Sequence, residues 1–275
     1  MKNQFFKLFP VIVLLVGVIA AADIAHAAGS GARDTEKLAK DSQNPISSLI
    51  SLPFENNIHF NNGPENATTY LLNVKPVYPV RFSENWNLVN RVIMPFIYQD
   101  ERFPGEGSRG GIGDTTYQGF FSPSKGGKLI WGIGPSVLIP TGSGDRMSSD
   151  KWAAGPSFVG LTMPGHWVIG ALVSNIWSFA GEGDAENVNS FSLQYFINYN
   201  MKGGWYLSSA PTITANWEAD SGNKWTVPFG ISVGRVFNIG KQPVNIKAGG
   251  LYNVEKPDPA SEWTLQAQIT LLFPK

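Results

Sequence analysis

The chain has 275 residues, 21 basic and 21 acidic residues, and no cysteine. The zero net charge gives no overall field that would recruit nucleic acid, and the lack of cysteine excludes disulfides and thiolate metal sites. Charged residues make up only 15% of the chain and the mean hydropathy is −0.08, because apolar and polar residues alternate rather than segregate.

Residues 1–27 have the features of a secretory signal peptide. Lys2 and Lys7 give a positive start, residues 11–22 form an uncharged apolar run, and Ala25-His26-Ala27 matches the small-residue cleavage site. The alternative is a membrane-anchoring helix, but the run is short for a hydrocarbon core of about 30 Å. We therefore predict export and cleavage near Ala27.

Residues 28–48 differ from the rest of the chain and form a predicted periplasmic segment. The charged stretch 33–41 predicts one or two helical turns that end near Asn44-Pro45. Two interpretations remain for this segment. It is either a flexible periplasmic leader, which we favour, or a small plug folded into the lumen of the domain that follows.

Residues 49–275 are predicted to form an outer-membrane β-barrel. No stretch here has the ~18 apolar residues of a membrane helix, and a closed barrel is the other fold that pairs every backbone group in lipid. Apolar and polar residues alternate with a period of two, as in 263–273. The alternation predicts an up-and-down antiparallel barrel of about twelve strands, near residues 49–60, 68–82, 86–98, 111–122, 129–140, 152–163, 166–177, 189–200, 205–217, 224–237, 243–254 and 263–273.

The connections between these strands alternate in length and in charge. Short turns are basic, with Lys125, Lys128, Lys202 and Lys241, whereas the longer segments hold most of the acidic residues. Outer-membrane barrels combine short periplasmic turns with longer external loops. An even number of strands then puts both ends of the chain on the periplasmic side.

Tryptophan is concentrated near the ends of the predicted strands. Amphipathic indoles favour the lipid headgroup level, where the ring is buried and the N–H is hydrated. We therefore predict that all nine lie at the membrane interfaces: Trp86, Trp131, Trp152, Trp167, Trp177, Trp205, Trp217, Trp225 and Trp263.

Charged residues inside the predicted strands are expected to face the lumen, because Arg or Lys at the lipid midplane costs about 2–4 kcal/mol. This set comprises Glu55, Lys75, Arg81, Arg91, Asp114 and Lys247. It either lines a polar channel or fills a closed barrel with ion pairs. If Glu55 pairs with Lys75, Arg81 and Arg91 leave a positive zone that predicts a mild preference for anions.

The sequence predicts no catalytic residue, cofactor site or metal site. After the signal peptide only His59 and His166 remain as histidines, and neither the G-x-S-x-G elbow nor the calcium-loop pattern occurs. A serine beside His59 would still permit an outer-membrane lipid-modifying enzyme.

Several stretches resemble a family of bacterial outer-membrane proteins, often labelled as transporters and misleadingly named neuromedin U. This family is similar to the outer-membrane proteins of the meta-cleavage pathway of phenol degradation. The resemblance covers about residues 43–275 and is carried by short stretches: Gln43-Asn44-Pro45, Leu52-Pro53-Phe54, Pro104-Gly105-Glu106-Gly107, Gly127-Lys128-Leu129-Ile130-Trp131-Gly132, Trp177-Ser178-Phe179-Ala180-Gly181, Ala215-Asn216-Trp217-Glu218-Ala219-Asp220-Ser221-Gly222 and Gly240-Lys241-Gln242-Pro243-Val244-Asn245. It implies the barrel fold and carries over no ligand-binding residue.

The function that these features favour is passive passage of small solutes, including aromatic or amphipathic ones, across the bacterial outer membrane. A non-conducting structural or surface-binding barrel is the first alternative, and a lipid-modifying enzyme is the second. The expected partners are outer-membrane lipid, the barrel-assembly machinery and a small solute, with no nucleic acid.

Overall fold

The protein is described by a computed structural model that covers residues 31–144 and 147–274. The predicted signal peptide therefore lies outside the described residues. Within them, helix α3 (Gly31–Gln43) and the short 3-10 helix η1 (Lys202–Gly204) accompany fifteen strand segments. The segments are β1 (Ile50–Asn62), β2 (Ala67–Val74), β3 (Val77–Arg81), β4 (Trp86–Gln99), β5 (Arg109–Ile112), β6 (Thr115–Pro123), β7 (Ile130–Ile139), β8 (Lys151–Thr162), β9 (Trp167–Gly181), β10 (Asn189–Asn200), β11 (Trp205–Ser209), β12 (Thr212–Asn216), β13 (Trp225–Ile239), β14 (Gln242–Glu255) and β15 (Trp263–Phe273).

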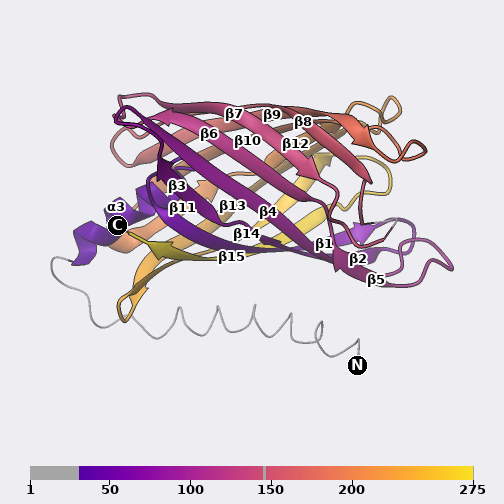
Figure 1. Ribbon diagram of the computed structural model, residues 1–275. Helices are drawn as coiled ribbons and strands as arrows, with labels where there is room; N and C mark the ends of the chain where they lie inside the picture. Colours follow the sequence, from indigo (N-terminus) through magenta and orange to yellow (C-terminus); the bar gives the residue numbers. More distant parts are fainter. Residues whose placement is uncertain (1–30, 145–146, 275) are drawn as a thin grey trace.

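The segments form one closed antiparallel barrel, as the sequence predicts. Consecutive strands pair with one another, and the last strand pairs with the first from Ile50–Phe273 to Phe60–Trp263. In the described chain the barrel has twelve strands, because β2 with β3, β5 with β6, and β11 with β12 are each one interrupted strand. Figure 1 shows the barrel lying on its side, with short turns at the left end and longer loops at the right.

Two of the three interruptions occur at prolines. Pro76 separates β2 from β3 and Pro211 separates β11 from β12, because a proline has no N–H to donate to a sheet ladder. The neighbouring backbone stays connected to the barrel. Lys75 N donates to Pro53 O at 2.9 Å, and Val92 N donates to Pro76 O at 3.1 Å.

The alternating residues separate into an inner and an outer face. Large apolar side chains such as Ile197, Leu207 and Leu265 lie exposed on the outside, whereas Phe196, Ser208 and Thr264 are buried on the inside. The nine tryptophans lie near strand ends, mostly exposed, and form contacts across strands. Trp86 meets Trp131 with ring centroids 5.9 Å apart, and Trp217 meets Trp225 at 5.3 Å.

Helix α3 lies at the end of the barrel that carries the short turns, beside the end of β15 (Figure 1). Its Ala39 is fully buried against Leu49, Val236 and Leu272, which belong to the chain after the helix and to β13 and β15. Among the described residues no helix is long and apolar enough to cross a membrane. The segment 31–49, called the plug below, thus packs against inward side chains of β13 and β15.

Polar contacts hold the plug to several strands. Gln43 and Asn200 exchange two side-chain hydrogen bonds of 2.9 and 3.0 Å. Asn245 Nδ2 donates to Ser42 Oγ at 3.2 Å, and Lys40 Nζ donates to the carbonyl of Gly165 in the β8–β9 turn. These contacts fix the helix to β10, to β14 and to the β8–β9 turn.

Ile46 extends the plug further into the lumen. Only 5% of its surface is exposed, and it joins an apolar cluster of inward side chains that come from strands on one side of the barrel: Val89, Phe120, Val159, Leu161, Val168, Leu172 and Phe196. The turn that directs it inward is held by Asn44, whose Oδ1 accepts from Ile46 N at 3.0 Å. The turn end of the lumen is therefore packed with apolar side chains.

Candidate functional site: the barrel lumen

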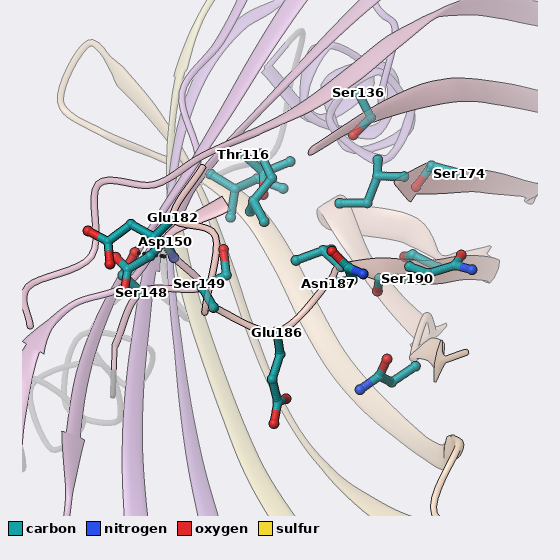
Figure 2. Close-up of a pocket in the computed structure, with 18 of the residues that line it drawn as sticks. Thr116, Ser136, Ser148, Ser149, Asp150, Ser174, Glu182, Glu186, Asn187 and Ser190 are labelled. Atoms are coloured by element: carbon teal, nitrogen blue, oxygen red, sulfur yellow. Dashed lines mark hydrogen bonds between the residues drawn. The ribbon is translucent and has the colours of Figure 1, made fainter. Parts of the chain in front are cut away.

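The loop end of the lumen is open and polar. One cavity there has a volume of about 1100 Å³ and is lined in the lumen by Gln118, Ser136, Ser174 and Ser192, among others. Figure 2 shows Ser136, Ser174 and Ser190 on one side of this space, with Asp150 and Glu182 from the loop end of the barrel on the other. A second cavity of about 590 Å³ lies beside it and extends to Glu55 and Lys75. We call these two cavities the outer chamber.

A third cavity, the inner chamber, has a volume of about 160 Å³ and lies between the plug and the lumen wall. Residues of the plug, including Asp41 and Gln43, line it together with Arg91 and Lys247. Glu55, Lys75, Gln194 and Ala210 line both this cavity and the 590 Å³ cavity. The two chambers therefore meet at these four residues.

The meeting point carries a cluster of charges, Glu55, Lys75, Arg91 and Lys247, which we call the cationic cluster. Lys75 Nζ lies 2.6 Å from Glu55 Oε1, which confirms the predicted ion pair. Asn57 Nδ2 donates to the same oxygen at 3.3 Å. The register brings Lys247, Gln268 and Glu55 side by side across β14, β15 and β1.

Arg91 and Lys247, the other two basic groups of the cluster, interact with the same carboxylate, Glu55. The negative charge of Glu55 acts on both Arg91 and Lys247, although Lys75 already pairs with it. Arg91 Nη1 is buried and has no hydrogen-bond partner in the described part of the chain. The cluster thus combines three basic groups with one carboxylate in a narrow part of the lumen.

Two residues assigned to the lumen from sequence, Arg81 and Asp114, lie outside the cationic cluster. Arg81 is exposed at the turn end, where its Nε donates to Ser83 O at 3.4 Å. Asp114 accepts four hydrogen bonds from loop 140–150, two from Ser149 at 2.7 Å and one each from Gly142 and Ser148. Its carboxylate therefore organises the loop between β7 and β8. A sequence pattern that reports only which face of a strand a residue takes does not reveal this role.

Sequence reasoning did not identify Ile46, Gln43 and Asn200 as lumen residues. A usable signal was present, since Val89, Phe120 and Phe196 interrupt the polar inward faces of their strands near the short turns. Apolar side chains gathered at one end of a lumen require an apolar partner. The isoleucine that follows Asn44-Pro45 supplies it.

The two histidines of the described residues, His59 and His166, lie in different parts of the barrel. His59 Nδ1 is 2.8 Å from the hydroxyl of Thr264, and both residues line the 590 Å³ cavity inside the barrel. His166 lies in a short turn, where its ring stands 5.8 Å from that of Tyr199. Within the described ranges no group of three or more metal-ligating side chains comes together.

The family model described as "Putative MetA-pathway of phenol degradation" matches residues 65–269, most of the barrel. The chain belongs to this family. The match confirms the predicted resemblance to the phenol-degradation outer-membrane proteins. The twelve-stranded barrel is the architecture of an outer-membrane protein. No curated protein matches its sequence significantly.

Solved structures support the same fold for this family member. An outer membrane channel from Pseudomonas putida F1 superimposes with a TM-score of 0.64 at 15% identity, covering 84% of this chain and 97% of that one. The NanC porin superimposes with a TM-score of 0.51 at 11% identity, covering 82% of this chain and 100% of that one. At these identities the likeness concerns the fold alone.

Proposed function

We propose that this barrel lets small solutes cross the bacterial outer membrane passively. The observation that carries the proposal is the row of polar cavities that leads from the external loops to the cationic cluster and on to the inner chamber. Both structural relatives are named as channels or porins, which supports the same function. The mixed polar and apolar lining favours small aromatic or amphipathic solutes over bulk water flow.

The plug bears on how such passage would occur. Residues 31–49 occupy the turn end of the lumen, with Ile46 in a closely packed apolar cluster. We infer that solutes pass when this segment shifts. The first alternative, a non-conducting barrel, corresponds to a plug that never leaves.

Measurement of ion selectivity in planar bilayers tests the proposal. We expect a mild preference for anions, because rings of Arg or Lys favour anions in narrow pores and the low-dielectric walls strengthen their field. The double substitution Arg91→Gln/Lys247→Gln should reduce or reverse the preference, as read from the reversal potential in a salt gradient. Arg81→Gln, which removes the same charge at the exposed rim, is the control and should change little.

Two outcomes would contradict this assignment. A cation-selective channel that the double substitution leaves unchanged would show that Arg91 and Lys247 fill the barrel without lining the path. Absence of conductance under all salt conditions and voltages would favour the alternative of a non-conducting structural barrel.

The proposal also covers location and partners. We propose that the mature protein begins at Ala28 in the outer membrane, with the nine tryptophans in contact with lipid headgroups and with the barrel-assembly machinery acting during insertion. Mass spectrometry of the protein from outer-membrane fractions should give the mass of residues 28–275. A protein that retains residues 1–27, or one recovered from the soluble periplasm, would refute this assignment.

We assign no catalytic residue to the barrel. The hydroxyl nearest His59 belongs to a threonine on the lumen side, whereas a lipid-modifying enzyme needs a nucleophile that its lipid substrate can reach.

A further inference from the structure

The inner chamber has an excess of positive charge. Its charged lining consists of three bases and two acids: Lys75, Arg91, Lys247, Asp41 and Glu55. The 2.6 Å ion pair between Lys75 and Glu55 removes one charge of each sign. Two bases, Arg91 and Lys247, then remain against one acid, the plug residue Asp41.

Asp41 offsets these two cations only in part. It is close enough to Lys37, on the same helix, for the two charges to interact. Partial burial in the plug raises the pKa of Asp41, and the nearby Lys37 opposes this shift. The chamber therefore keeps about one uncompensated positive charge at neutral pH.

Arg91 indicates which chemical group a ligand of the inner chamber would carry. Its Nη1 is buried without an acceptor among the described residues. Buried donors in native proteins nearly always have a partner, and a charged donor without one is especially unfavourable. A guanidinium presents two parallel N–H groups that match a carboxylate.

The rest of the wall is apolar enough to hold a small hydrophobic body. Phe196, Val77, Leu49 and two prolines line the chamber together with the polar groups. Its volume of about 160 Å³ is close to the roughly 150 Å³ cavity known to accept benzene in an engineered protein. The chamber can thus contain one ring or an equally compact chain.

We propose that the inner chamber is a binding site for a small monocarboxylate with a compact apolar body, such as an aromatic acid with one ring. The carboxylate contacts Arg91 and Lys247, and the ring lies toward Phe196 and Val77. This inference deepens the proposed function, on which it rests for the route of the ligand, because it names the solute class that the lumen retains.

Isothermal titration calorimetry of the refolded full-length barrel with sodium benzoate tests the site. We expect saturable 1:1 binding that weakens by about tenfold or more in Arg91→Gln/Lys247→Gln, since loss of charge-assisted hydrogen bonds of this kind costs at least that factor. Arg81→Gln is the matched control and should bind like the wild type. Each variant is first checked for heat-modifiable gel migration, and Arg91→Lys, which keeps the charge, should bind with intermediate affinity if the double variant does not fold.

Two further ligands test the contributions of the ring and of the carboxylate separately. Benzyl alcohol has the ring without the charge, and acetate has the charge without the ring; both should bind more weakly than benzoate. Equal binding of benzyl alcohol, or benzoate binding unchanged by the double substitution, would overturn the carboxylate site. Equal binding of acetate would overturn the role of the apolar wall.

Conductance of the same preparations distinguishes this inference from the proposed function. Benzoate binding without conductance would support the binding site and contradict the proposed passage of solutes. Conductance without benzoate binding would retain the channel and overturn the site.

Discussion

Replacing Ile46 by aspartate is expected to raise the conductance of the barrel several-fold. Ile46 is 5% exposed and packs among apolar side chains such as Phe120 and Leu172. Burying a carboxylate there without a partner costs roughly several kcal/mol. The segment should therefore leave the lumen, which opens the turn end while the twelve strands stay paired. Single-channel recordings in planar bilayers measure the change.

The neighbouring Ser48 provides a matched control. It is exposed, so Ser48→Asp adds the same charge to the same segment without burying it, and its conductance should equal that of the wild type. Heat-modifiable migration on gels should be preserved in both variants. An Ile46→Asp barrel that is folded and no more conductive than the wild type would show that the plug does not limit passage.

Arginine at Leu193 is expected to block assembly of the barrel, whereas arginine at the adjacent Gln194 is expected to be tolerated. Leu193 lies on the outer face of β10, where its neighbours across the sheet are Val173 and Ile213. Gln194 lines both the inner chamber and the 590 Å³ cavity. An arginine near the lipid midplane costs about 2–4 kcal/mol, while a polar lumen can hydrate it.

The measurement is the fraction of protein that migrates as a folded barrel after refolding into lipid vesicles. Leu193→Arg should lose most of this fraction and Gln194→Arg should keep it. Because adjacent residues of one strand face opposite sides, equal tolerance at the two positions would mean that the faces of β10 are assigned incorrectly.

The sequence by itself determined the strands of this protein. All twelve predicted strands occur within a few residues of their expected bounds, because a strand with lipid on one side must alternate in polarity along its whole length. The pairing of Glu55 with Lys75 was also readable, since both lie on inward faces of adjacent strands. Local periodicity is enough for such features, as each depends on residues that are neighbours in sequence or in register.

The tertiary structure alone decided what occupies the lumen. The plug contacts Asn200 and Asn245, which follow it by more than 150 residues, and no local pattern encodes such a distant contact. The same holds for Asp114, whose partners belong to loop 140–150, and for Lys247, which reaches the cluster only because the barrel closes β15 against β1. Alternation shows which face a side chain takes, but its height in the lumen and its partners follow from the closure of the barrel.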